Sequence, residues 1–288
     1  MKKFILIFSI ALLISCAPQN KKLNLIFELP KDLKESSGIS YDTTNDLYWT
    51  LEDSGNKNEI YALNNSGKII KTIELEDIKN TDWEDIIKDK NGNLYIGDFG
   101  NNDNLRQDLA IYKINVADLD NEIIQETIKI SFNYPEQTKF PPGKNEMFFD
   151  VEGFIEMNNN FYLFTKNRSK KMNGTVYIYK IPNQAGNHNA QKIAEFKTCD
   201  DSDNCLITSA SISPNDKQIA LLTHNKVWIF GDFKDDDFTS GKISIFDLNH
   251  VSQKESICYK NNETLIIGDE KSKKTGGNVY EILISDLK

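Results

Sequence analysis

Three glutamates occupy equivalent positions in repeated segments of this sequence. Glu84, Glu152 and Glu255 each lie near the start of a short segment that continues with aliphatic or aromatic residues. Carboxylates that converge repel one another unless they are protonated, hydrated or neutralised by a cation. Calcium accepts six to eight oxygen ligands in flexible geometry, so these residues favour a Ca²⁺ site. We predict Glu84, Glu152, Glu255 and Glu35 as its ligands, with a water-filled acidic channel as the alternative.

Zinc is a poorer candidate for such a site. The chain contains three histidines, and none of them belongs to a paired motif such as His-Glu-x-x-His. The donors available near the glutamates are therefore oxygens. This composition favours a hard cation such as Ca²⁺.

The glutamates belong to a pattern that the chain repeats five times. Each copy has a strand that begins with polar or acidic residues, a short gap, and an aromatic-aliphatic strand that ends on polar residues. Repeats of about 45 to 70 residues that consist only of strands are typical of β-propeller blades. The copies span residues 35–53, 82–100, 150–168, 208–225 and 253–270.

The number of strands predicts five blades and a closed ring. No segment longer than a turn shows a helical apolar period, so we expect an all-β domain. The last copy leaves room for only three strands before the chain ends, and residues 23–30 (LNLIFELP) are expected to supply the fourth. Six blades remain an alternative if residues 121–148 contain a degenerate blade.

Propeller geometry brings polar strand ends together at one mouth. The first strand of a blade is innermost and antiparallel to the second, so the start of one and the end of the other lie at the same end of the sheet. We therefore expect a common rim around the glutamates. Its predicted members are Asp53, Asn101, Asn167 and Glu270.

Two classes of function fit this mouth. In a calcium-dependent hydrolase of esters, lactones or phosphoesters, the metal would activate water, with Asp98 or Asp269 as general base. Developing negative charge would then be stabilised by Lys166, Arg168 or His224. In a binding propeller the same mouth would hold an ion and recognise a small molecule, a glycan or a protein. We favour binding, because the sequence contains no complete acid-base constellation and no Gly-x-Ser-x-Gly nucleophile motif.

The N-terminal residues predict export and lipidation. Lys2 and Lys3 precede an apolar run that is too short to span a bilayer as a helix. The run ends in Leu-Ile-Ser-Cys, which resembles a bacterial lipobox with Cys16 as the lipidated residue. We expect a signal peptide over residues 1–15, a lipidated tether over 16–22 and a propeller over 23–288, anchored to the membrane.

Charge and cysteine usage agree with an exported domain. Removal of the two signal lysines leaves 32 of the 34 basic residues against 43 acidic ones, a net charge of −11. Such a balance disfavours nucleic acid as a partner, and we expect a monomer. An oxidising compartment permits a Cys199–Cys205 bridge, whereas Cys258 lies in an apolar strand and is expected to be buried.

Several motifs resemble a known family. Glu-Ser-Ser-Gly-Ile from residue 35, Asp-Trp-Glu-Asp from residue 82 and Gly-Asp-Phe-Gly-Asn-Asn from residue 97 are similar to those of β-propeller lipoproteins of Bacteroidetes. Those proteins are related to the SdiA-regulated family, and more distantly to esterase-like phytase and NHL-type propellers. The resemblance implies a propeller at the outer membrane, facing the periplasm, and calcium binding in related proteins. Gly153 and Ser256 depart from an alanine that often follows the glutamate.

Overall fold

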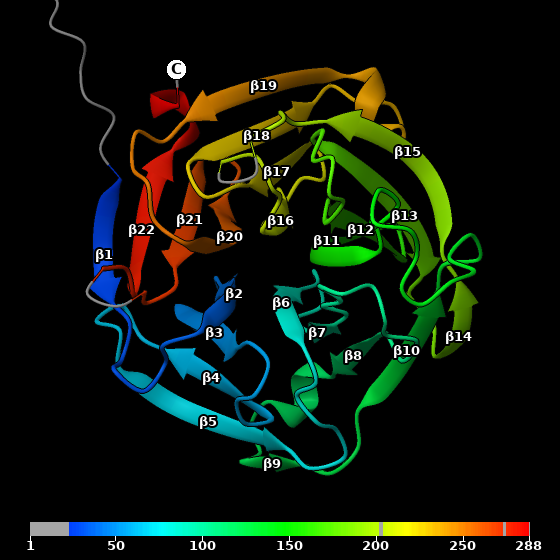
Figure 1. The fold of residues 1–288 in the computed structure, drawn as a ribbon. Helices are drawn as coiled ribbons and strands as arrows, with labels where there is room; N and C mark the ends of the chain where they lie inside the picture. The colour runs from blue at the N-terminus through cyan, green and yellow to red at the C-terminus, as the bar shows by residue number, and fades with distance from the viewer. Residues whose placement is uncertain (1–22, 202–203, 273–274, 288) are drawn as a thin grey trace, which may run out of the picture.

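The computed structural model describes residues 23–201, 204–272 and 275–287. Five antiparallel β-sheets are arranged radially around one axis, as Figure 1 shows in a view along that axis. The prediction of a single five-bladed β-propeller is confirmed. The expected signal peptide, tether and lipidation site Cys16 lie outside the described residues.

Each blade consists of four antiparallel strands, which follow one another from the axis outward. Blade 1 contains β2 (Ser36–Asp42), β3 (Leu47–Glu52), β4 (Glu59–Leu63) and β5 (Ile69–Leu75). Blade 2 contains β6 (Trp83–Lys88), β7 (Leu94–Asp98), β8 (Ala110–Ile114) and β10 (Ile128–Asn133). Blade 3 contains β11 (Asp150–Met157), β12 (Asn160–Lys166), β13 (Thr175–Pro182) and β15 (Gln191–Lys197). Blade 4 contains β16 (Ser209–Ile212), β17 (Gln218–Leu222), β18 (Lys226–Gly231) and β19 (Lys242–Asp247).

The N-terminal strand closes the ring. Blade 5 contains β20 (Lys254–Asn261), β21 (Thr264–Asp269) and β22 (Asn278–Leu283), and its outer strand is β1 (Asn24–Glu28), which pairs antiparallel with β22. The first and last strands of the domain thus share one sheet, which covers the outer edge of β22. This arrangement confirms the closure that the strand count predicts.

Two short strands link neighbouring blades. β9 (Ile123–Ile124) lies between β8 and β10 in the chain but pairs in parallel with β5 of blade 1. β14 (Gly186–Asn189) lies between β13 and β15 but pairs in parallel with β10 of blade 2. The segment that might have formed a sixth blade therefore supplies β9 and β10 to existing sheets, and its remaining described residues form turns and a loop.

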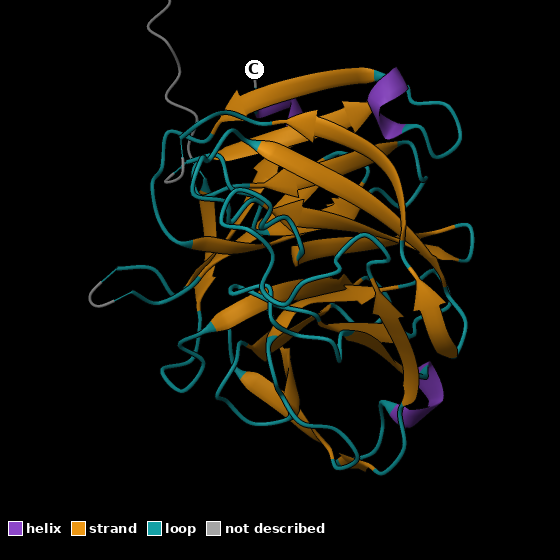
Figure 2. Ribbon diagram, turned by 45° about the vertical axis from the view of Figure 1, so that its right-hand side comes forward, coloured by secondary structure: helices purple, strands orange, loops and turns teal. Residues whose placement is uncertain are grey.

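Apolar residues, both aliphatic and aromatic, pack between adjacent sheets. Trp49 and Trp83 pack between blades 1 and 2, and Trp228 packs between blades 3 and 4. Large flat side chains bury much area in the wedge between two twisted sheets. In the described residues, helix is limited to single 3₁₀ turns at Val116–Asp118, Phe238–Ser240 and Ile284–Asp286 (Figure 2). Within the described ranges, no helix has the length and apolar character of a membrane span.

The inner strands meet at the axis and close it midway. A Cβ atom added to Gly38 would lie 2.6 Å from the backbone nitrogen of Ile86, and one added to Gly153 would lie 2.5 Å from that of Ala210. The buried carboxylate of Asp85 accepts hydrogen bonds from the backbone nitrogen of Ile86 and, across the axis, from the hydroxyl of Ser209 in blade 4. Backbone and side chain thus fill the middle of the propeller and divide the axis into two separate mouths.

The cysteines follow the sequence-based expectations. Cys199 and Cys205 form a disulfide that closes a loop between blades 3 and 4. Cys258 is a free, buried thiol in β20, where it packs against residues of blade 1. Neither feature belongs to the acidic mouth described below.

Candidate functional site

A β-bulge in four of the five inner strands positions the residues of the predicted ring. The pairing of inner and second strands shifts register between Ser36 and Gly38, Trp83 and Asp85, Val151 and Gly153, and Lys254 and Ser256. A bulge leaves one residue unpaired and redirects its side chain. The residues at these bulges are Ser37, Glu84, Glu152 and Glu255, one from each of blades 1, 2, 3 and 5. Blade 4 has a continuous register at this position.

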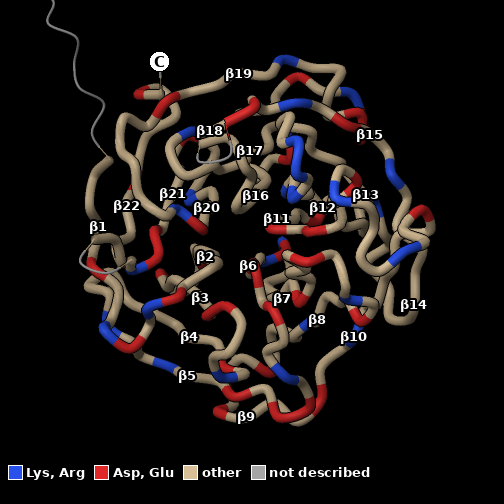
Figure 3. Tube along the Cα trace, in the orientation of Figure 1, with Lys and Arg blue, Asp and Glu red and all other residues tan. Residues whose placement is uncertain are grey.

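These side chains line a cavity at the end of the axis where the inner strands begin. We call it the acidic mouth; its volume is about 230 Å³. Acidic segments gather around this point in the view along the axis (Figure 3). The lining contains six carboxylates and two basic side chains, besides Ser36, Ser37, Asn102 and Gln253. The charged members are Glu35, Asp53, Glu84, Glu152, Glu255, Glu270, Lys166 and Arg168.

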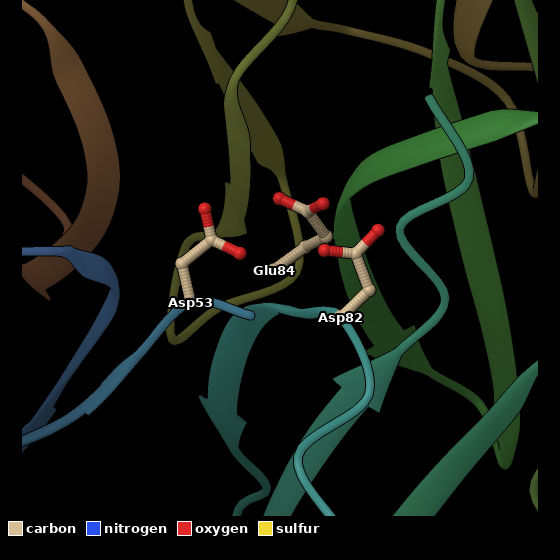
Figure 4. A group of neighbouring side chains, drawn as sticks. All are labelled: Asp53, Asp82 and Glu84. Atoms are coloured by element: carbon tan, nitrogen blue, oxygen red, sulfur yellow. The ribbon is translucent and has the colours of Figure 1, made fainter. Parts of the chain in front are cut away.

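One group of three carboxylates converges without a basic partner. Oxygen atoms of Asp53, Asp82 and Glu84 lie within 4.8 Å of one another, and Figure 4 shows the three side chains side by side. Glu84 is only 8% exposed, lines the cavity, and accepts no hydrogen bond from the described residues. We call this group the carboxylate triad. It presents several oxygen donors to one point, which is the arrangement that Ca²⁺ binding requires.

Gly100 makes room for the triad. A Cβ atom at this position would lie 2.1 Å from Oε1 of Glu84 and 2.5 Å from Oδ2 of Asp82. The backbone nitrogen of Gly100 donates a hydrogen bond to the carbonyl of Asp82, which fixes the segment beside it. A larger residue at position 100 would therefore displace both carboxylates.

A second group of carboxylates is neutralised by lysine and arginine. Glu84, Asp150 and Glu152 also lie within 4.8 Å of one another. Arg168 donates from Nε to Asp150 and from Nη2 to Glu152, the latter at 2.7 Å, and Nζ of Lys166 lies 2.9 Å from Glu152. Two cations thus balance two carboxylates of this group, whereas no lysine or arginine among the described residues forms an ion pair with the triad.

The electrostatics of the triad favour a bound cation. Burial, and then the charges of Glu152, Asp150, Asp53 and Asp82, raise the pKa of Glu84 well above its usual value. Burial and the neighbouring carboxylates of Asp53 and Asp150 raise the pKa of Asp82 to about 6. Without a cation, Asp82 and Glu84 retain their protons to a higher pH than free carboxylic acids do. A divalent ion would displace these protons when it binds.

Blade 5 and the start of blade 1 form the other side of the mouth. Burial, and then the charges of Glu255, Asp53 and Glu35, raise the pKa of Glu270 to about 7. Gln253 donates a hydrogen bond to Glu270, and Asn56 donates to Glu35 at 2.7 Å. Among the described residues, Glu35 and Glu255 do not join either group of close carboxylates. They add negative charge to the wall of the mouth.

The remaining residues that the sequence placed at the mouth do not line the cavity. Asp98 accepts from Arg106 at 2.8 Å and from the backbone nitrogen of Asp82, so it positions Asp82. Asp269 accepts from the backbone of Asn278 and from the hydroxyl of Tyr280. Asn101 forms hydrogen bonds with the backbone of Phe149 and Arg106, and Asn167 forms them with Ser169 and Asn173. Nε2 of His224 lies 3.3 Å from Oε1 of Glu255.

The sequence pointed to the mouth but did not select all of its close contacts. Asp82 and Asp150 lie at the start of inner strands, yet neither was chosen as a ligand. The motif Asp-Trp-Glu contains a usable signal, because it places a second carboxylate two residues before Glu84 at the same end of an inner strand. The role of Gly100 has no such local signal, since it depends on how the end of one strand packs on the start of another.

Comparisons with known proteins agree with this architecture. A model of the SdiA-regulated family matches residues 19–138, which contain the first two blades. A search of curated proteins gives no match. The PQQ-bound aldose sugar dehydrogenase from Streptomyces coelicolor is similar in fold, with a TM-score of 0.53, 8% sequence identity, and coverage of 90% of this chain and 97% of that chain.

Two further structures match more weakly. The nidogen/laminin complex gives a TM-score of 0.49 at 12% identity, covering 89% of this chain and 78% of that chain. Hydrazine synthase from Kuenenia stuttgartiensis gives 0.44 at 10% identity, covering 81% and 61%. At these identities, similarity concerns the fold and implies no shared activity.

Proposed function

We propose that this β-propeller, whose residues 19–138 match the model of the SdiA-regulated family, is a binding protein whose acidic mouth holds a divalent cation. Ca²⁺ is the proposed ion, and a small molecule, a glycan or a protein segment is the proposed further ligand at the same mouth. The proposal includes attachment to the cell envelope through Cys16, in the outer membrane and facing the periplasm. Export and lipidation are proposed from the Lys2-Lys3, apolar-run and Leu-Ile-Ser-Cys pattern of the N-terminus, and the outer membrane and its periplasmic face from the resemblance to propeller lipoproteins.

The observation that carries the proposal is the uncompensated carboxylate triad. Asp53, Asp82 and Glu84 converge within 4.8 Å, and the buried carboxylate of Glu84 faces the cavity without a hydrogen-bond donor among the described residues. The two basic side chains that line the mouth, Lys166 and Arg168, contact Asp150 and Glu152 instead. A cation at the triad would offset both the burial and the repulsion that raise the pKa values of Asp82 and Glu84.

The donor set supports Ca²⁺ over other common cations. The triad offers only carboxylate oxygens, whereas zinc sites in proteins use histidine or cysteine. A cavity of about 230 Å³ leaves room for waters and a small polar ligand around the ion. Ca²⁺ tolerates such irregular and partly hydrated surroundings, while Mg²⁺ requires near-octahedral geometry.

Binding is better supported than hydrolysis. The two general bases expected from the sequence, Asp98 and Asp269, are engaged by Arg106, Tyr280 and backbone amides, and neither lines the cavity. Lys166 and Arg168 line it, but their positive charges already lie against carboxylates. A hydrolase would need a base in reach of the metal-bound water, and the expected candidates do not provide one.

The test is a Ca²⁺ titration of the purified protein after removal of metal by a chelator. Heat of binding and melting temperature are recorded for the wild type, for Glu84→Gln, and for Glu263→Gln, which changes an exposed glutamate in the β20–β21 turn. We expect one Ca²⁺ to bind and to raise the melting temperature. Glu84→Gln should weaken binding at least about tenfold, a loss of about 1.4 kcal/mol, while Glu263→Gln leaves it unchanged.

Two results would overturn this proposal. One is the absence of Ca²⁺ binding by the wild type, and the other is unchanged affinity in Glu84→Gln. A panel of esters, lactones and phosphoesters, assayed with Ca²⁺ present, separates the two classes of function. A metal-dependent turnover that Glu152→Gln abolishes would replace binding with hydrolysis as the function of the mouth.

A further inference from the structure

A second cavity lies at the opposite end of the propeller axis. We call it the lower cavity; its volume is about 690 Å³, three times that of the acidic mouth. It is formed where the inner strands end, and all five blades contribute to it. The two cavities share no lining residue, and the close backbone contacts at Gly38 and Gly153 lie between them. A molecule in one cavity is therefore separate from a molecule in the other.

The floor of the lower cavity is apolar. Each inner strand contributes an isoleucine to its lining, but four of the five are at most 2% exposed, so most of this aliphatic ring lies beneath the cavity surface. Ile212 and Tyr41 are only partly buried, which leaves apolar surface open to the cavity. Small-molecule sites typically combine such a floor with a few polar groups, in volumes of about 300 to 1,000 Å³. The five isoleucines are Ile39, Ile86, Ile155, Ile212 and Ile257.

Six of the nine charged side chains that line the lower cavity pair with one another. Lys260 pairs with Glu281 outside the lining, and Asp89 and Glu156 accept hydrogen bonds from uncharged donors. Three lysines of its lining each pair with an aspartate of the same lining. One of these pairs joins the β6–β7 turn of blade 2 to the β16–β17 turn of blade 4. A charged ligand therefore meets no uncompensated charge of opposite sign at these positions. The pairs are Lys88 with Asp42 at 2.5 Å, Lys90 with Asp216, and Lys71 with Asp120 at 3.7 Å.

We propose that the lower cavity is a second ligand site, for an uncharged small molecule with an aromatic or aliphatic body and hydroxyl or carbonyl groups. The apolar floor would bury the body of this ligand. The hydroxyls and amides of the wall, among them those of Thr43, Asn45 and Ser211, would bind its polar groups. Because this site shares no residue with the acidic mouth, its ligand binds independently of Ca²⁺.

The test uses fluorine NMR with two probes that differ only in charge, 4-fluorobenzyl alcohol and 4-fluorobenzoate, in the presence of a chelator. Two variants fill the cavity from different blades: Ile212→Trp at the end of β16 and Thr43→Trp in the exposed β2–β3 turn. The matched control is Ile245→Trp, which changes an exposed isoleucine on the outer strand of blade 4. Melting temperatures show which variants are folded.

We expect the alcohol to bind the wild type more tightly than the benzoate does. Thr43→Trp, and Ile212→Trp if it folds, should weaken binding of the alcohol at least about tenfold, while Ile245→Trp and added Ca²⁺ leave it unchanged. The proposal is overturned if the alcohol does not bind, if folded Thr43→Trp retains full affinity, or if the benzoate binds as tightly. None of these results depends on whether Ca²⁺ occupies the acidic mouth.

Discussion

Replacement of Asp82 by asparagine is expected to stabilise the cation-free protein at neutral pH. The unfolded chain releases this proton near the usual pKa of 3.8, whereas the folded protein retains it up to about pH 6. Stability is therefore lost as the pH rises from 3.8 to 6, and the full penalty remains at higher pH. A difference of about two pKa units corresponds to about 3 kcal/mol, which partial exposure of Asp82 reduces to about 2 kcal/mol.

The measurement is urea denaturation of wild type and Asp82→Asn at pH 4 and pH 8, in a chelator. We expect equal stability at pH 4, and an advantage of about 2 kcal/mol for the variant at pH 8. In thermal unfolding this corresponds to a rise of about 4 to 8 °C for a domain of this size. The control is Asp103→Asn, which removes the same charge from an exposed loop residue close in sequence.

With Ca²⁺ present, the wild type is expected to become more stable than Asp82→Asn. Ca²⁺ should stabilise the wild type by RT ln(1 + [Ca²⁺]/Kd) and should stabilise Asp82→Asn much less. Two results would refute the electrostatic account of the mouth. One is that Asp82→Asn is no more stable than the wild type at pH 8 without a cation. The other is that the variant is more stable than the wild type by the same amount at pH 4 as at pH 8.

Three further substitutions test the mouth, the ring closure and the disulfide. Gly100→Ala should lower Ca²⁺ affinity at least about tenfold in a calorimetric titration, because the added Cβ would overlap the carboxylates of the triad. Unchanged affinity would exclude a role for these carboxylates. Phe27→Ala in β1 should lower the free energy of unfolding in urea by about 3 to 5 kcal/mol. Phe27 is buried and packs edge-on against Tyr48 of blade 1, with 5.0 Å between the ring centroids. A decrease below about 1 kcal/mol would show that ring closure contributes little. The double substitution Cys199→Ser/Cys205→Ser should lower the free energy of unfolding by about 2 kcal/mol, the loop-entropy value for a bridge with a sequence separation of six. Equal melting temperatures of the variant and the wild type would contradict this prediction.

The fold was accessible from the sequence because its determinants are local and repeated. Alternation of apolar and polar residues marks each strand, and repeats mark the blades. The ring closure also followed from the sequence, since blade 5 lacked one strand and residues 23–30 had no other blade to join. The links made by β9 and β14 were not predicted, because two- and four-residue strands carry almost no pattern of their own.

The carboxylates of the mouth could be predicted only in part. Glu84, Glu152 and Glu255 were identified by their shared position, and the structure places all three around one cavity. Which carboxylates approach each other depends on β-bulges and on loop packing between blades, so the convergence of Asp53 with Asp82 had no sequence signal. The same limit applies at the strand ends, because a register shift of one residue turns a side chain to the other face. Asp98 and Asp269 therefore point to Arg106 and Tyr280 rather than into the mouth.

The most direct test of the central claim is an anomalous-scattering map from crystals grown with Ca²⁺ or Tb³⁺. We predict a peak at the carboxylate triad, within about 2.3 to 2.6 Å of oxygens from Asp53, Asp82 and Glu84. The same map from Glu84→Gln crystals should lack this peak while Lys166 and Arg168 remain on Asp150 and Glu152. A wild-type map without a peak in the acidic mouth, at metal concentrations that saturate the protein in solution, would contradict the account.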